Sequence, residues 1–153
     1  MCLYIDERFH GKFFGNPTPA AETLIDVLCF KGLERSYSDS NRNSWVSPYQ
    51  GMMYQFGKLY KSELYQNEMG DIDEGLHSYR SERHGKEFDF GGTDYGLFPA
   101  IIPKGSKIFV SSRGHGEYAS GRLIVFKDMA MLEAVYGKVA PAVKQVEALQ
   151  RLK

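Results

Sequence analysis

Hydrophobic and polar positions form short alternating or apolar runs along most of this chain, and polar or glycine-containing turns separate the runs. Short runs that are rich in β-branched and aromatic residues are typical of β-strands. The pattern predicts strands over residues 1–5, 23–31, 52–62, 75–79, 100–102, 107–111 and 122–126. Residues 23–31 can alternatively begin a helix, and Gly57-Lys58 can break the next run as a turn or bulge.

Helical patterns are concentrated near the end of the sequence, apart from a short charged helix predicted over residues 80–88. Asp128 is a suitable N-cap for a helix over residues 129–136, and Gly137 is suited to end it. Pro141 fits the first turn of a second helix, whose apolar stripe consists of Val143, Val146, Leu149 and Leu152. The stripe predicts docking on the sheet of the same chain or, alternatively, contact with a partner or a second copy.

These elements predict an α+β fold: a single domain with a mainly antiparallel, twisted sheet and C-terminal helices. A chain of 153 residues is long enough to bury one core, and no repeat or linker divides it. We expect residues 1–137 to form a β-rich globular domain. Residues 138–153 would form an amphipathic helix that belongs to this domain or serves as an oligomerisation element.

Three connections between the expected strands are distinctive. Residues 32–50 are polar and form a long loop, which is a common place for functional groups. Residues 103–106 match a type II turn with Pro103 at the first corner and Gly105 at the second, although their backbone could alternatively hold an anion. The connection over residues 112–121 carries three ionisable side chains between glycines.

Composition changes this picture in two ways. Aromatic residues make up 14% of the chain, which favours strands and also suits a platform that stacks on a ligand. The 19 basic residues balance 19 acidic ones, whereas nucleic-acid binding requires a basic surplus. The charge balance therefore disfavours nucleic acid as a partner.

Cysteine content and apolar run lengths indicate the compartment. Cys2 and Cys29 do not form a disulfide framework, and Cys29 lies in an apolar run that predicts a core residue with a raised thiol pKa. The first residues become charged at once, and no apolar run is long enough to span a bilayer. We expect a cytoplasmic protein without membrane attachment.

Motifs for metals, phosphates and nucleophilic catalysis do not occur in recognisable form. The four histidines lack the helical spacing of a zinc site, and the acidic stretch 68–74 lacks the ligand register of an EF-hand. No P-loop, dinucleotide-binding fingerprint or nucleophile elbow is present. The sequence predicts no metal site and no cofactor.

A set of polar and aromatic residues in or beside the connections is the candidate site: Arg35, Trp45, Tyr49, His77, Ser78, Tyr79, Arg113, His115 and Glu117. If the strand order brings them to one edge of the sheet, they line a single cleft. Arginine binds phosphate and aromatic rings stack on bases, so such a cleft suits a nucleotide-like ligand. The alternative is that each residue serves its own turn.

Five short motifs resemble those of small bacteriophage and prophage proteins that have no established activity. In order they read SPYQG at 47–51, GKLY at 57–60, EGLHSY at 74–79, IPKGS at 102–106 and GEYAS at 116–120. The resemblance extends over about residues 27–126. It implies a phage or mobile-element setting, in which small accessory proteins often act on the host, for instance by blocking a defence system.

A weaker similarity connects the chain with ADP-ribosyltransferases of the Arg, Ser-x-Ser, Glu type, because Arg35, the stretch 75–79 and Glu117 occur in that order. The similarity implies that Arg35 holds the phosphates of NAD and that Glu117 stabilises an oxocarbenium-like transition state. The sequence departs from the pattern, since His-Ser-Tyr replaces Ser-x-Ser and Glu117 stands without a second acidic or amide residue.

Three functions are therefore expected in turn. The first is a phage-associated accessory protein that binds a nucleotide-like ligand or a host protein. The second is an ADP-ribosyltransferase-like enzyme, the only one of the three that uses NAD. The third is a structural protein that forms a homo-oligomer through residues 138–153.

Overall fold

Antiparallel strands make up most of the regular structure of this protein. The computed structural model describes residues 20–35, 44–47, 52–66, 72–86, 95–111 and 116–139. The strands are β1 (Ala21–Glu22), β2 (Val27–Arg35), β3 (Trp45–Val46), β4 (Met53–Tyr54), β5 (Leu59–Lys61), β6 (Tyr65–Gln66), β7 (Ile72–Glu74), β8 (Leu76–Tyr79), β9 (Tyr95–Ile102), β10 (Lys107–Val110), β11 (Glu117–Ser120) and β12 (Arg122–Val125). The helices of the described part are α2 (Glu82–Lys86) and α3 (Met129–Tyr136).

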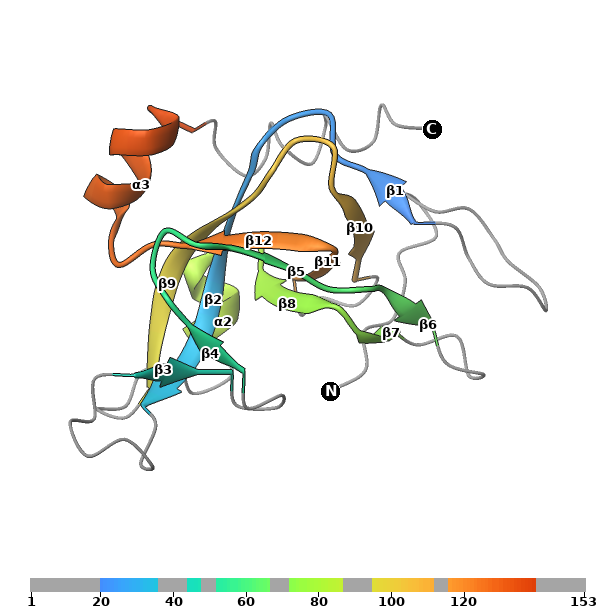
Figure 1. The fold of residues 1–153 in the computed structure, drawn as a ribbon, viewed down its shortest axis with the longest axis horizontal. Coiled ribbons are helices and arrows are strands. Elements are labelled where there is room, and N and C mark those ends of the chain that lie inside the picture. The colour runs from blue at the N-terminus through green and yellow to red at the C-terminus, as the bar shows by residue number, and fades with distance from the viewer. Residues whose placement is uncertain are drawn as a thin grey trace.

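The main sheet has the strand order β1-β10-β11-β8-β2-β9-β12-β5, and β3 joins β2 to β4 beside it (Figure 1). All of its strand pairs are antiparallel. The longest pair joins β2 and β9, from Val27 opposite Ile102 to Glu34 opposite Tyr95. Strands β6 and β7 form a separate two-stranded sheet.

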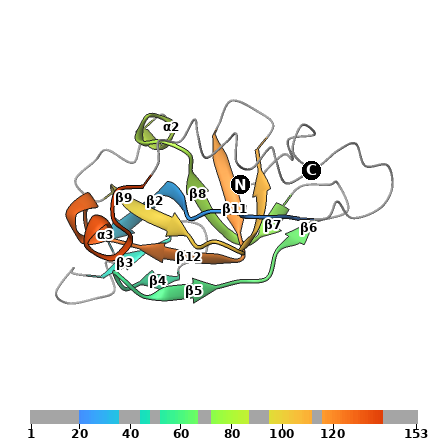
Figure 2. The same ribbon diagram turned by 90° about the horizontal axis from the view of Figure 1, so that it is seen from above.

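The main sheet is strongly curved because consecutive strands β11 and β12 pair with different neighbours. β11 lies between β10 and β8, whereas β12 lies between β9 and β5. Gly121 separates the two, and its N–H donates to the Lys107 carbonyl at 2.9 Å while its own carbonyl accepts from the Ser62 N–H at 2.9 Å. The bend at Gly121 therefore brings both ends of the sheet to one core (Figure 2).

The concave, inner face of the sheet carries the largest core cluster. Successive residues of a strand point to opposite faces, and directly opposed residues of an antiparallel pair share a face. In β2 the inward positions are Val27, Cys29, Lys31 and Leu33. The cluster also takes side chains from strands at both ends of the sheet: Leu76, Ala100, Ile102, Ile108, Val110, Tyr118, Leu123 and Val125.

The two helices cover parts of the outer face. In α3, Leu132 packs on Ile101 and Phe126, and the rings of Phe126 and Tyr136 meet edge to face at 5.9 Å. In α2, Gly85 lies so close to Leu97 that an added Cβ would stand 2.4 Å from a methyl group of that leucine. Figure 2 shows the two helices at separate places on the sheet.

Several expectations about the fold are confirmed. The structure is a mostly antiparallel sheet with few helices, although it is richer in sheet than a balanced α+β fold. The helix over 129–136 is present, and Asp128 caps it by accepting from the Met131 N–H at 2.8 Å. Residues 140–153, which include the expected second helix, lie outside the described residues, as do residues 1–5.

Other expectations about strands are wrong. The strand over 52–62 divides into β4 and β5 at a turn around Gly57, whose φ of 83° favours glycine. Residues 117–120 were expected in a connection but form β11, which pairs with both β10 and β8. The loop over 32–50 contains the end of β2 and all of β3. Glu, Ala and Ser are weak strand formers, so only pairing on both sides makes residues 117–120 extended.

The turn over residues 103–106 is held by its own chain. Ser106 N–H donates to the Pro103 carbonyl at 3.1 Å, which makes Pro103 the first residue of the turn and not its first corner, as expected. Thr23 Oγ1 donates to the same carbonyl at 2.9 Å, and Arg122 Nη2 donates to the Lys104 carbonyl at 2.8 Å. Neither helix of the described ranges is long and apolar enough to cross a membrane.

Candidate ligand-binding face of the sheet

The inner face of the sheet contains a buried lysine. Lys31 is only 5% exposed, its Nζ donates to the His77 carbonyl at 2.6 Å, and it lies 5.5 Å from the centre of the Tyr54 ring. Burial lowers the pKa of Lys31 from 10.5 to about 8, although the nearby Cys29 and Glu117 oppose this shift. The lysine therefore carries its charge at neutral pH in a place that disfavours charge.

The position of Lys31 follows from the alternation in β2. Because Cys29 and Leu33 face the core, the residue between them faces it as well. A lowering of the pKa from 10.5 to about 8 corresponds to a cost of about 3 kcal/mol for keeping the amine charged in the fold. Buried groups that reduce stability and have shifted pKa values are concentrated at functional sites.

Three buried hydroxyl groups share this face with Lys31. Tyr118 is directly opposite Ser78 in the β11–β8 pair, and Tyr54 lies under the lysine. Within the described part of the chain, the oxygens of Tyr54, Ser78 and Tyr118 have no hydrogen-bond partner of standard geometry. The Ser78 hydroxyl is near enough to the Cys29 thiol to favour its charged form slightly. A buried hydroxyl without a partner costs free energy, so these groups require an explanation.

An aromatic cluster continues the inner face towards the end of β2. The guanidinium of Arg35 lies 5.2 Å from the centre of the Trp45 ring. Trp45 meets Phe98 edge to face at 4.8 Å, and Phe98 lies 5.1 Å from Phe56. The three rings are half-buried and Arg35 is exposed, so this cluster is in contact with solvent.

The register places the aromatic cluster and the buried lysine on the same face. Trp45 is directly opposite Arg35 in β2 and opposite Tyr54 in β4. Phe98 is directly opposite Lys31 in the β2–β9 pair. One continuous set of side chains therefore leads from the exposed Arg35 to the buried Lys31.

Glu117 lies on the other face of the sheet. It is directly opposite Tyr79, which is opposite Phe30, an outward residue of β2. Arg35 is five residues further along β2, which is roughly 17 Å at the rise of a strand. Arg35 and Glu117 are thus separated both along the sheet and by the sheet itself.

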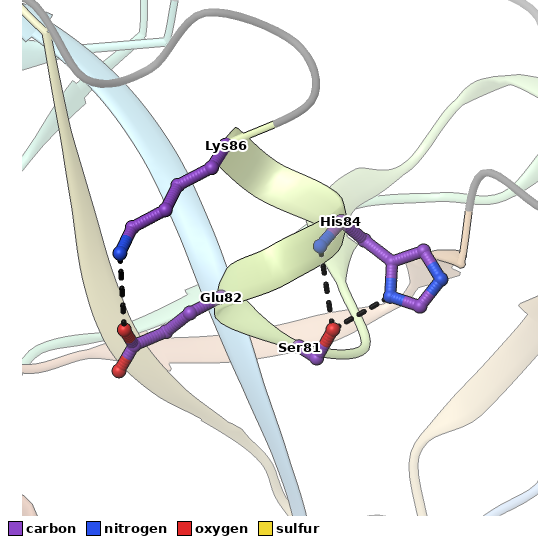
Figure 3. Close-up of polar contacts among 4 residues, drawn as sticks. All are labelled: Ser81, Glu82, His84 and Lys86. Carbon is purple, nitrogen blue, oxygen red and sulfur yellow. Dashed lines mark hydrogen bonds and ion pairs between the residues drawn. The ribbon is translucent and has the colours of Figure 1, made fainter.

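Helix α2 adds a histidine next to Glu117. Figure 3 shows Ser81 Oγ at 2.6 Å from His84 Nδ1, and the same oxygen accepts from the His84 N–H at 3.3 Å. The His84 ring lies against Gly116, where an added Cβ would stand 2.5 Å from it. Glu82 and Lys86 form an exposed ion pair at 3.9 Å on the same helix. The histidine therefore packs on the backbone immediately before Glu117.

The structure divides the candidate residues into two groups. It joins Arg35 with Trp45 on the inner face, where Ser78 also points. It joins Glu117 with Tyr79 on the outer face, where His77 also lies by alternation. The expectation that Arg35, Trp45 and Glu117 lie in loops is wrong, because all three belong to strands. The remaining candidates, Tyr49, Arg113 and His115, lie outside the described residues.

The sequence interpretation missed the most unusual member of the inner face. Lys31 was taken as the end of an apolar run, yet its spacing of two from Cys29 and Leu33 already indicates an inward position. Cys29 itself is buried, as expected, and burial raises its thiol pKa to about 12. Tyr54 and Tyr118 could be expected to be buried, but their unpartnered hydroxyl groups are visible only in the structure.

Metal ligands do not gather in this part of the molecule. Across the described ranges there is no group of three or more His, Cys, Asp and Glu side chains placed to hold a metal ion. Comparisons with protein-family models, with curated proteins and with solved structures gave no match. Functional inference for this chain therefore depends on the geometry of its inner face.

Proposed function

We propose that this protein is a binding protein that holds a nucleotide-like ligand on the inner face of its sheet, at the Arg35–Trp45 end. One observation carries the proposal: an exposed guanidinium lies 5.2 Å from the centre of the only tryptophan ring in the chain. Because Trp45 and Phe98 are already packed edge to face, the platform is fixed before a ligand arrives.

The chemistry of these groups suits both parts of a nucleotide. The half-buried ring of Trp45 has a π face on which a base can stack, and base–aromatic stacking contributes about 1–3 kcal/mol. Arginine binds phosphate through two parallel hydrogen bonds, and the exposed Arg35 loses little solvation when it does so. Stacking and phosphate recognition therefore come from neighbouring side chains.

The enzyme alternative requires Arg35 and Glu117 to contact the same NAD molecule. Their positions on opposite faces of the sheet argue against that arrangement. We therefore place binding before catalysis. The phage or mobile-element setting is a separate proposal, supported by the resemblance of the motifs at 47–51, 57–60, 74–79, 102–106 and 116–120. In that setting the ligand would be a nucleotide signal or metabolite of the host.

A thermal-shift panel of ATP, GTP, AMP and NAD tests the proposal. A nucleotide present at 100 times its dissociation constant is expected to stabilise the protein by about 2.7 kcal/mol. Arg35→Ala and Trp45→Ala should remove the shift. Lys58→Ala is the matched control, because it removes another cation that lies 5.5 Å from an aromatic ring, that of Tyr60. No shift with any of the four, or a shift that survives both variants, would overturn the proposal and favour a host protein as the partner.

A further inference from the structure

The buried part of the inner face, around Lys31, has a different chemistry from the Arg35–Trp45 end. It is formed by Lys31 of β2, Tyr54 of β4, Ser78 of β8 and Tyr118 of β11, each of which is at most 5% exposed. Four separate strands thus contribute one polar side chain each to a core that is otherwise apolar. Neither the aromatic cluster nor Arg35 accounts for them.

We propose that Lys31 and the hydroxyl groups of Tyr54, Ser78 and Tyr118 form a buried site for a small oxyanion, such as a carboxylate or inorganic phosphate. This proposal is independent of the nucleotide-binding function, because it uses none of the residues that carry that function. Its success or failure therefore leaves the Arg35–Trp45 proposal unchanged.

The charge of the cluster favours an anion. Lys31 donates to the His77 carbonyl and lies over the Tyr54 ring, but it forms no ion pair among the described residues. A buried charge without an opposite charge is costly, and a bound anion would offset that cost. A metal cation would instead be repelled by the ammonium group. Lys31 therefore selects the sign of the ligand.

The hydrogen-bonding capacity of the cluster also favours an oxyanion. An ammonium group has three donors, and the His77 carbonyl uses one of those of Lys31. The hydroxyl groups of Tyr54, Ser78 and Tyr118 each add a donor that finds no acceptor within the described residues. Carboxylate and phosphate oxygens accept several such bonds. One small anion can therefore satisfy groups that the fold leaves unsatisfied.

Around neutral pH, Lys31 is the member of the cluster whose charge changes. Cys29 of the same strand has its pKa raised to about 12 by burial, and burial also raises the pKa values of Tyr54 and Tyr118. Glu117 acts on Lys31 from β11, and Arg80 acts on Tyr118. Since the amine loses its proton above pH 8 or so, anion affinity should fall about tenfold per pH unit beyond that point.

Calorimetric titration of the full chain with sodium acetate and, separately, with inorganic phosphate tests the site and distinguishes the two sources of oxyanion. At least one is expected to bind at pH 7, and its affinity at pH 9.5 should be lower by more than tenfold. Ser78→Ala and Tyr118→Phe should each weaken binding at least threefold. Both variants remove one hydroxyl group and retain the fold-forming part of the side chain.

Ser120→Ala is the matched control for Ser78→Ala. Ser120 is also buried on the inner face, but its Oγ already donates to backbone carbonyls, at 3.0 Å in the case of Arg122. Its removal should leave anion affinity unchanged. The proposal is overturned if neither anion binds, if affinity is the same at both pH values, or if Ser120→Ala weakens binding as much as Ser78→Ala.

Discussion

Lys31 reaches across the neighbouring strand from the inner face of the sheet, and its Nζ donates to the backbone carbonyl of His77 at 2.6 Å. This contact joins the central strand β2 to β8 in a region where the two strands share only one residue pair, Phe30 with Tyr79. It also holds an ammonium group among apolar residues of the core. The consequences for stability, for ligand binding and for pH dependence can each be measured.

Replacing the buried amine by a thioether should stabilise the protein. We expect Lys31→Met to raise the free energy of unfolding by about 2 kcal/mol at pH 7, because the burial cost of the charge exceeds the lost hydrogen bond. Chemical denaturation of both proteins in anion-free buffer measures the difference. Lys61→Met, on the exposed face of β5, is the control and should change stability by less than about 0.5 kcal/mol.

The pH dependence of that difference has a definite sign. Below pH 8 the amine is protonated in both the folded and the unfolded chain, so the cost is fully present. Between pH 8 and 10.5 the unfolded chain binds a proton that the folded chain lacks, so the native protein gains stability relative to Lys31→Met as pH rises. An advantage of the variant that stays constant from pH 7 to pH 10 would contradict this account.

Two buried serines on the inner face should respond differently to the loss of their hydroxyl groups. Ser120→Ala breaks a hydrogen bond to the Arg122 carbonyl and should cost about 1 kcal/mol. Ser78→Ala removes an oxygen that is unpartnered in the described structure, so it should be neutral or stabilising in anion-free buffer. Denaturation curves for both variants give the comparison, and an equal loss in the two would show that Ser78 is satisfied in the free protein.

The contact between His84 and Gly116 should be visible in a pair of glycine substitutions. Both Gly116 and Gly137 have positive φ angles, 59° and 68°, so alanine is strained at each by about 1 kcal/mol. Only at Gly116 does the new Cβ meet a side chain, the His84 ring at 2.5 Å, whereas nothing lies within 4 Å of it at Gly137.

Gly116→Ala is therefore expected to lower the free energy of unfolding by at least about 1 kcal/mol more than Gly137→Ala. The double variant Gly116→Ala with His84→Ala should recover that excess, because the ring is then absent. Equal losses for the two single variants would mean that His84 does not pack on this backbone.

Much of the sheet could be predicted from the sequence because its strands carry local signals. Residues 75–79 and 122–126 are rich in strand formers, and the helix over 129–136 has a cap at each end. Residues 117–120 escaped prediction because Glu, Ala and Ser do not favour strands, and the neighbours that make them extended are distant in sequence.

The candidate site could be predicted only in part, for a similar reason. Residue types mark Arg35 and Trp45 as ligand-binding candidates, but whether they face the same side as Glu117 depends on strand register. Lys31 shows the opposite case, since its phase in β2 was readable from the alternation of Cys29 and Leu33. An unpartnered hydroxyl, by contrast, has no local sequence signal.

Trp45 offers the most direct test of the proposal that the inner face binds a nucleotide-like ligand, because it is the only tryptophan in the chain and contacts Arg35. Its fluorescence can be titrated with ATP, GTP, AMP and NAD in turn. The account predicts saturable quenching by at least one of them, lost in Arg35→Ala and retained in Lys58→Ala. Fluorescence that does not change with any of the four would contradict it.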